Sequence, residues 1–269
     1  VYGSYQMPAS DKQQLARALG MKPKKVRIIS AYVGGGFGSK LGIAPEVVAA
    51  ALAARKLGRP VKTVMSRQQV FDATVRRSNT HQRIRLGAGA DGRLTTVVHE
   101  TVSSNIEGEE YFEPAGVSTH FLYAGENRRI THDLLPMDWL LSGSMRAPGE
   151  AAGMLALEAA MDELAEKLDM DPVELRKIND PELDPLKGVP FSTRQLTRCL
   201  DEGAAAFGWK DRNPTPAARR EGEWLIGHGM AASARSNQLQ ESQARVSIGA
   251  DGRATVETDM TDIGTGTYT

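Results

Sequence analysis

The sequence has little cysteine, no excess of either charge and no long apolar run, and each absence excludes a class of protein. One cysteine, Cys199, occurs among 269 residues, which excludes an intramolecular disulfide framework and a zinc or iron–sulfur site built from several cysteines of this chain. Basic and acidic residues number 33 each, so the charge footprint of a nucleic-acid-binding protein is missing. No uninterrupted apolar stretch of about 18 residues is present, so no membrane span is predicted.

Motifs of hydrolases and zinc peptidases are also missing. No G-x-S-x-G elbow occurs, and the five histidines show no H-E-x-x-H spacing. A structural role is therefore the simpler interpretation of each histidine: His81, His99, His120, His132 and His228. Cys199 lies in a helical pattern beside Leu200, which predicts a buried position.

The most distinctive segment is the glycine-rich stretch Ala31–Lys40, AYVGGGFGSK. Closely spaced glycines leave backbone N–H groups bare, so such a loop can surround an oxyanion. Two nucleotide-binding motifs fail here. The Walker loop needs Gly before its Lys, where Ser39 stands, and the dinucleotide fingerprint needs its third glycine at the same position. A turn required only for packing is the alternative interpretation.

The pattern around this loop predicts a mixed α/β (α+β) fold. An apolar strand, Val26–Val33, precedes the loop, a helix follows at Pro45–Leu57, and a second strand is predicted at Val61–Met65. This order predicts a βαβ unit with the glycine loop at its carboxyl edge. Alternating segments around Asp-Gly turns predict antiparallel hairpins at 81–98 and 244–256.

The sequence predicts mainly helices between residues 150 and 208. Helices are expected at Glu150–Leu168, after an Asp171 cap, and from Ser192 to Gly208. The stretch 107–136 shows little periodicity and is predicted to be a long connection. Proline-rich residues 213–222 are predicted to link a first region, 1–212, to the start of a second region, 223–269, which we expect to be truncated.

Four separate segments have the character of backbone or charge binding sites. They are Gln6, the loop Gly34–Lys40, Arg146 in a turn before a long helix, and Gly264–Gly266. Each alone is unremarkable, and an isolated Arg146 is more often a surface or capping group. Together they predict a large anionic cofactor held by loop ends and one guanidinium, as in phosphate or pterin recognition.

These segments resemble a known family. In family order the chain carries Ser4-Tyr5-Gln6, GGGFGSK, MRAPGEA, DPVELRKIN and DIGTGTYT. The combination is similar to the molybdenum-cofactor-binding large subunit of the xanthine dehydrogenase/aldehyde oxidase family. Its bacterial aldehyde oxidoreductase and isoquinoline 1-oxidoreductase branch is the most similar. The resemblance implies the molybdopterin-binding domains of a molybdenum hydroxylase, of which this chain is expected to be an internal fragment.

The resemblance also implies an activity and partners. Family members hydroxylate a small-molecule substrate at a carbon next to a heteroatom, with oxygen from water and two electrons passing to molybdenum. The implied cofactor is molybdenum–molybdopterin, with a cytosine dinucleotide form as one alternative. Iron–sulfur clusters and FAD are expected on partner subunits. Two alternatives stay open: a non-catalytic anion- or nucleotide-binding α/β module, and an assembly scaffold subunit.

Individual positions take implied roles from the family motifs. Gln6 matches the glutamine near the molybdenum oxo group, Arg146 matches an arginine against the pterin, and no side chain of this chain is implied to bind the metal directly. Thr265 stands where many relatives carry Gln, so only the backbone contact is carried over there. The implied cofactor-binding residues are Gln6, Gly35, Gly36, Phe37, Gly38, Arg146, Gly264, Thr265 and Gly266.

Two departures from the family bear on the substrate, and one absence bears on catalysis. Leu41 stands where purine-oxidising relatives carry an acid, and Pro148 stands where they carry an aromatic residue. Both changes favour an aldehyde or N-heteroaromatic substrate over xanthine. The family's general-base Glu lies in a later G-x-G-E loop that this sequence does not contain. The isolated 269-residue chain is therefore expected to have no catalytic residue and to be inactive.

Overall fold

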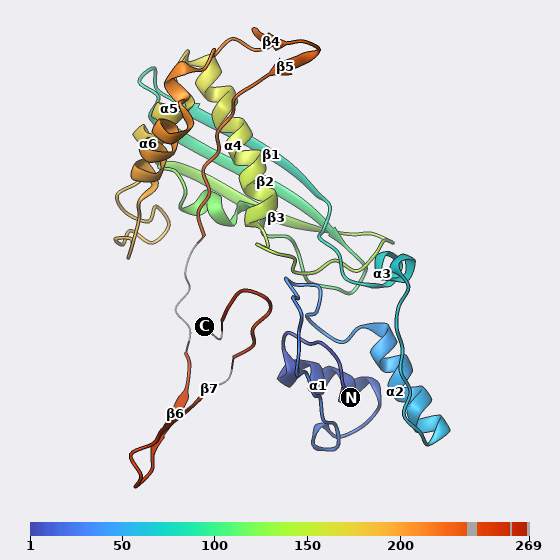
Figure 1. Ribbon diagram of the computed structural model, residues 1–269. Coiled ribbons are helices and arrows are strands. Elements are labelled where there is room, and N and C mark those ends of the chain that lie inside the picture. The colour runs from blue at the N-terminus through green and yellow to red at the C-terminus, as the bar shows by residue number, and fades with distance from the viewer. Residues whose placement is uncertain (236–240, 259, 268–269) are drawn as a thin grey trace.

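A computed structural model describes residues 1–235, 241–258 and 260–267 of the chain. A sheet covered by helices forms the larger body, and a smaller N-terminal lobe lies beside one end of it (Figure 1). A β-hairpin extends away from both. The mixed α/β class predicted from the sequence is confirmed.

The larger body is built on a three-stranded sheet in the order β1 (Thr80–Ala88), β2 (Leu94–Asn105), β3 (Asn127–Pro136). β1 and β2 are antiparallel and joined by the predicted Asp91-Gly92 turn, so this hairpin is confirmed. Gly92 has φ +82°, which a residue with a side chain seldom adopts. β3 pairs with β2 in parallel, after a connection that contains the 3₁₀-helix η2 (Ala115–His120).

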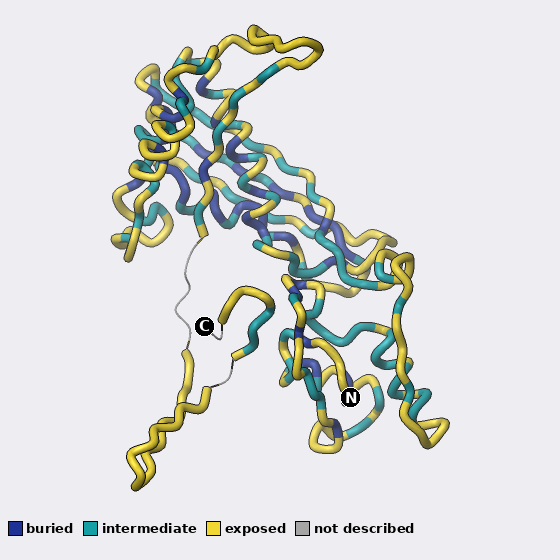
Figure 2. Tube along the Cα trace, viewed as in Figure 1, coloured by how far each residue is buried: buried dark blue, intermediate teal, exposed yellow. Residues whose placement is uncertain are grey.

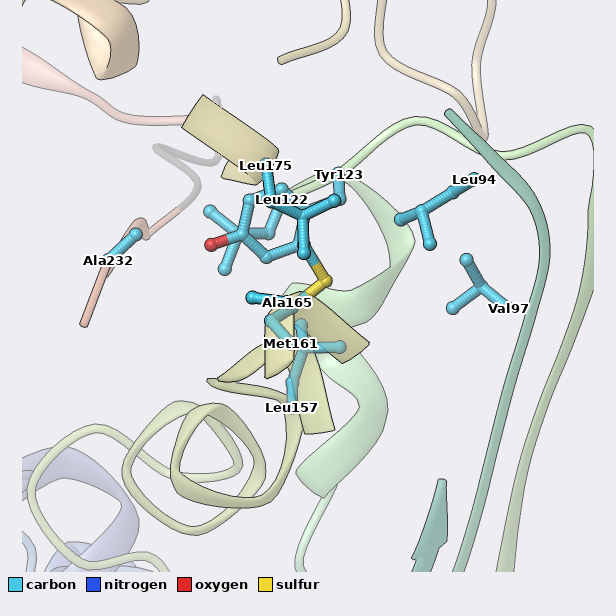
Figure 3. Close-up of a cluster of buried hydrophobic side chains, with 9 residues drawn as sticks. All are labelled: Leu94, Val97, Leu122, Tyr123, Leu157, Met161, Ala165, Leu175 and Ala232. Atoms are coloured by element: carbon cyan, nitrogen blue, oxygen red, sulfur yellow. The ribbon is translucent and has the colours of Figure 1, made fainter. Parts of the chain in front are cut away.

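The main core lies between this sheet and the helix α4 (Glu150–Lys167), which crosses one face of it (Figure 1). Figure 3 shows the cluster, in which side chains from β2, the β3 connection, α4 and α5 meet. Each large apolar side chain buried here contributes about 1.5–3 kcal/mol. Figure 2 shows that burial is concentrated along this body. The buried members are Leu94, Val97, Leu122, Tyr123, Leu157, Met161, Ala165, Leu175 and Ala232.

Two shorter helices close one end of the body. α5 (Pro172–Ile178) is capped as predicted, because Asp171 Oδ1 accepts hydrogen bonds from the N–H groups of Val173 and Glu174. α6 (Leu196–Phe207) begins later than predicted. Cys199 lies on α6 and is exposed, so the prediction that it is buried was wrong. The reason is that α6 turns Leu200, not its neighbour, into the core.

A buried ion pair connects these helices to the segment that follows them. The side chain of Arg176 is fully buried, and its Nε lies 2.8 Å from Oε2 of Glu158 on α4. Glu158 also accepts hydrogen bonds from the Tyr123 hydroxyl at 2.5 Å and from the Ala232 N–H at 2.6 Å. The carboxylate is therefore fully paired inside the protein, as a buried charge requires.

His99 on β2 is fully buried, and its environment favours the neutral ring. Nε2 donates to Gln82 Oε1 at 3.0 Å, and Nδ1 accepts from the Thr119 hydroxyl at 2.7 Å. Burial, followed by the nearby His132 and His120 rings, lowers the pKa of His99 to about 4. Burial also lowers the pKa values of His120 and His132, so the neutral ring is favoured at all three positions.

The stability of the protein is expected to fall as the pH drops below about 6.5. The unfolded chain binds a proton at His99 near pH 6.5, whereas the folded chain does so only near pH 4, so protons favour the unfolded state between these values. His99 alone lowers the unfolding free energy by about 2 kcal/mol between pH 7 and pH 5. Urea unfolding at both pH values measures this loss, and it should be smaller by that amount in His99→Gln. An equal loss in both proteins contradicts the assignment.

The N-terminal lobe contains α1 (Pro8–Ala18), the 3₁₀-helix η1 (Pro23–Lys25), α2 (Pro45–Leu57) and α3 (Arg67–Ala73). Leu15, Ala16 and Val26 form its small core. α2 has its predicted bounds, with Pro45 in the first turn and the left-handed Gly58 as its cap. Although α2 is largely apolar, none of its residues is buried.

Neither of the two strands predicted before and after α2 is formed, so the βαβ prediction was wrong. Of Val26–Val33, Ile29 makes an isolated parallel bridge to Tyr2, and Val61–Met65 lies in no strand. A strand needs a neighbour to take up its N–H and C=O groups. Here Ile29 finds that neighbour in the first residues of the chain, through bonds to Val1 and Gly3.

The remaining strands form two hairpins, β4 (Arg219–Glu221) with β5 (Trp224–Ile226), and β6 (Ala244–Ile248) with β7 (Ala254–Thr258). The β6–β7 pair confirms the second predicted hairpin. The stretch 107–136 is not a plain connection, because it holds η2 and β3. The predicted linker, residues 213–222, is exposed throughout and contains β4, and its role between two regions stays a prediction. Within the described residues, no helix has both the length and the apolar character needed to cross a membrane.

Candidate cofactor-binding site

The glycine loop is a tight turn that presents Phe37 at its tip. Gly34, Gly35, Phe37 and Gly38 all have positive φ, from +50° to +109°. Lys40 closes the loop, since its Nζ donates to the Val33 carbonyl at 2.5 Å. Gly36 and Gly38 are buried, whereas the Phe37 side chain is 41% exposed. The loop therefore exposes an aromatic ring on a strained backbone turn.

Gln6 is built into this loop from the N-terminal segment. Its Oε1 accepts hydrogen bonds from the N–H of Gly38 at 2.8 Å and of Lys40 at 3.2 Å. A Cβ at Gly36 would lie 2.5 Å from the same oxygen, so this glycine is required for the contact. The planar amide directs its Nε2 donor away from these two N–H groups. Gln6 can thus stabilise the loop and still donate to a ligand.

The turn that carries Arg146 lies directly against the loop. A Cβ at Gly38 would be 2.2 Å from the Ser144 carbonyl oxygen and 2.8 Å from Met145 Cα. The Arg146 guanidinium carbon is 5.9 Å from the centre of the Phe37 ring, which is within reach of a cation–π contact. The Arg146 side chain is exposed, so its charge is available beside the loop.

The fourth predicted segment also contacts the loop. The Gly36 N–H donates to the Ile263 carbonyl at 3.0 Å. A Cβ at Gly264 would lie 3.1 Å from the Phe37 ring and 3.2 Å from Gly35 Cα. The N–H groups of Gly264, Thr265 and Gly266 point to Asp262 Oδ1, at 2.7, 3.1 and 3.4 Å. An anionic ligand would therefore compete with the Asp262 carboxylate for these donors.

The structure thus brings together around Phe37 all four segments that the sequence singled out. The two substrate-pocket residues lie at their edge: Leu41 directly follows the loop, and Pro148 lies in the Arg146 turn, both half-buried. Neither lines the largely apolar cavity of about 830 Å³ that Ser39 and Lys40 form with the N-terminal segment and α2. Arg77 and Glu113, which contact the Arg146 turn, carried no signal in the sequence.

The donors gathered here suit an anionic, partly planar cofactor. Gln6 offers an amide donor, Arg146 a guanidinium that can pair with phosphate, and Phe37 an exposed ring. Gly36 and Gly38 leave no room for side chains, so the loop backbone itself forms the wall. This combination of groups suits a ligand that has both a planar ring and an anionic group.

Comparisons with known proteins identify the family of the chain. Residues 1–180 and residues 202–269 match two families of molybdopterin cofactor-binding domains. Over 270 aligned residues the chain is 48% identical to the aldehyde oxidoreductase molybdenum-binding subunit PaoC of Escherichia coli K12, covering all of this chain and 37% of that protein. It is 29% identical to the putative xanthine dehydrogenase molybdenum-binding subunit XdhA of the same strain, again covering 37% of that protein.

Solved structures show the same fold. The aldehyde oxidoreductase of Desulfovibrio desulfuricans matches with a TM-score of 0.78 and 23% identity, over 95% of this chain and 29% of that one. The enzyme of Desulfovibrio gigas matches with a TM-score of 0.75 and 24% identity, over 99% and 30%. The chain spans 37% of the length of PaoC and of XdhA. The chain belongs to the molybdopterin cofactor-binding domain family.

Proposed function

We propose that the protein containing this chain oxidises an aldehyde or an N-heteroaromatic compound, with molybdenum–molybdopterin as its cofactor. The observation that supports this most is the convergence of Gln6, the glycine loop, the Arg146 turn and the Gly264 loop around Phe37. When bound, the molybdenum centre supplies two-electron oxidation, with water as the source of the oxygen added to the substrate.

The residues of this chain hold and orient that cofactor. Gln6 donates from Nε2 while its Oε1 fixes the loop through Gly38 and Lys40. Arg146 pairs with the anionic part of the cofactor, and the Phe37 ring limits access of water on that side. Gly264, which lies against Phe37 and Gly35, contributes with Thr265 and Gly266 backbone N–H groups that the cofactor takes over from Asp262 Oδ1. A cytosine dinucleotide form of the pterin, and iron–sulfur and FAD groups on partner subunits that accept the electrons, belong to the same proposal.

The proposed substrate class follows from two side chains. Leu41 and Pro148 replace the acid and the aromatic residue that purine-oxidising relatives carry, so a purine would find neither a carboxylate nor an aromatic ring at these two positions. A hydrophobic aldehyde or a heteroaromatic ring needs neither. The name of the 48% identical relative, an aldehyde oxidoreductase, supports the same class.

Substrate preference is expected to exceed about a hundredfold in kcat/KM. The protein at its natural length, purified with its partner subunits, should oxidise an aromatic aldehyde or quinoline at least that much more efficiently than xanthine. Steady-state assays with a dye acceptor measure the three values on one preparation. Efficient xanthine turnover contradicts the substrate class. A preparation without bound pterin supports a non-catalytic binding module or scaffold instead.

A further inference from the structure

Two residues outside the motifs form an ion pair beneath the Arg146 turn. Glu113 precedes η2 and its side chain is fully buried, while Arg77 lies before β1 and is 29% exposed. Arg77 Nη1 lies 2.6 Å from Glu113 Oε1. Glu113 Oε2 accepts from the Tyr111 hydroxyl at 3.1 Å. Burial and then the Glu113 charge raise the pKa of Tyr111 to about 12, so this hydroxyl stays a donor.

Both members of the pair also bind the backbone of the turn. Glu113 Oε1 accepts from the Gly149 N–H at 2.7 Å. Arg77 Nη2 donates to the Arg146 carbonyl at 2.5 Å, and Nη1 lies 3.5 Å from the Ala147 carbonyl. The pair therefore holds the chain on both sides of Pro148. Before it the carbonyl groups of Arg146 and Ala147 are bound, and after it the N–H of Gly149.

The turn has a conformation that needs such support. Ala147 has φ +52° and Gly149 has φ +83°, and a left-handed backbone is strained at a residue with a Cβ. A Cβ at Gly149 would lie 2.2 Å from the Pro114 carbonyl oxygen. The turn is thus pressed onto the residue next to Glu113, and charge-assisted hydrogen bonds oppose its relaxation.

The position of the turn is passed on to the glycine loop. The Ser144 carbonyl and Met145 Cα form the surface against which Gly38 packs without a side chain. The Arg146 side chain begins at the residue whose carbonyl Arg77 holds. Any movement of the turn therefore moves the guanidinium and the wall behind Gly38 together.

We propose that Arg77 and Glu113 are positioning residues that hold the Arg146 turn, and through it Gly38, in the geometry that retains the molybdopterin cofactor. The inference rests on the proposed function. Capping of α4 alone is the competing explanation, because Gly149 precedes that helix and a carboxylate there is favourable. Capping needs the contact of Glu113 with Gly149. It does not need the bond from Arg77 to the Arg146 carbonyl.

The test compares Glu113→Gln and Arg77→Lys with a matched control in the natural-length holoprotein. Glutamine keeps an acceptor for Gly149 but loses the charge. Lysine keeps the charge but cannot make the forked contact to Glu113 and Arg146. The control is Asp171→Asn, which weakens a cap and an ion pair to Arg212 at α5, on an element that does not contact the turn.

Hydrogen exchange of backbone amides in 34–40 and 144–150 is the first measurement, and release of pterin and molybdenum from the folded protein is the second. We expect both to be about tenfold faster in Glu113→Gln and Arg77→Lys, since bonds to charged groups of this kind are worth at least that factor. Asp171→Asn should leave both unchanged.

Faster exchange confined to 144–150, with cofactor release as in the wild type, assigns the pair to capping and overturns the proposal. If the wild type holds no pterin, the proposed function fails, but coupled exchange of 34–40 and 144–150 still decides the positioning. Should Glu113→Gln fail to fold, Arg77→Lys carries the test, because it keeps the buried carboxylate paired.

Discussion

Replacing Gly38 by alanine is expected to remove the molybdopterin cofactor, whereas the same replacement at Gly34 should leave it bound. Both glycines lie in the same loop and have positive φ, +109° at Gly38 and +67° at Gly34. A Cβ at Gly34 meets nothing within 4 Å, so that change carries only the backbone strain of about 1–2 kcal/mol. Comparing the two variants therefore separates the effect of backbone strain from that of a steric clash.

At Gly38 the added methyl group would lie 2.2 Å from the Ser144 carbonyl oxygen and 2.8 Å from Met145 Cα. Both are backbone atoms, so no rotation of a side chain relieves the clash, and the loop must leave the Arg146 turn. Gly38 would also lose its hydrogen bond to Gln6. We expect the molybdenum content, measured by inductively coupled plasma mass spectrometry, to fall below about a tenth of the wild-type value. A Gly38→Ala protein that keeps its molybdenum contradicts this geometry.

Replacing Gly153 by alanine is expected to destabilise the protein, although alanine is the better helix former. Gly153 lies within α4, where alanine gains about 1 kcal/mol over glycine from propensity alone. A Cβ there would lie 1.6 Å from the Ala115 carbonyl oxygen in η2. α4 must move away from η2 to accept it, and overpacking of this kind costs about 1–3 kcal/mol or more. A contact of 1.6 Å places the cost at the upper end of this range, so the expected net loss is about 2 kcal/mol.

Gly203 in α6 provides the control for this change. It is exposed, it lies inside a helix, and a Cβ there meets nothing within 4 Å. Gly203→Ala should therefore stabilise the protein by about 0.5–1 kcal/mol. Urea unfolding of both variants measures two changes of opposite sign. A stabilised Gly153→Ala would mean that α4 does not approach η2 this closely.

Local patterns in the sequence predicted the elements that local chemistry determines. The Asp91-Gly92 turn, with alternating residues on both sides, predicted the hairpin of β1 and β2. Asp171 was predicted to cap a helix, and it caps α5. Pro45 and Gly58 marked the ends of α2. In each case the residues that decide the structure lie within one turn of it, so their effect can be recognised without knowing the rest of the fold.

Long-range pairing could not be predicted in the same way. β3 lies parallel to β2 at the edge of the sheet. Its half-buried face carries Arg128 and His132, so the sequence shows no apolar alternation and 107–136 resembled a connection. The segment Val26–Val33 has a strand-like composition, but which segment lies beside Ile29 depends on the path of the whole chain. The βαβ prediction was wrong for this reason.

The candidate site was predicted in part. Gln6, the glycine loop, Arg146 and Gly264 were singled out because they can offer bare backbone N–H groups, an amide and a guanidinium, and because they match motifs of the family. The structure brings them together. Arg77 and Glu113 were missed because a buried ion pair between distant positions has no local pattern. Their proposed role depends on hydrogen bonds to the backbone of Arg146 and Gly149. Such bonds do not depend on the residue type of the partner, so they leave no pattern in the sequence.

The most direct test of the proposed site is the position of the metal itself. Crystals of the natural-length holoprotein, measured at the molybdenum absorption edge, locate molybdenum by its anomalous scattering. We expect one peak per protein chain beside the Gln6 amide and the Phe37–Gly38 backbone, with continuous pterin density reaching Arg146. A molybdenum peak away from these residues, or pterin density that does not contact Gln6 or Arg146, would contradict the proposed site.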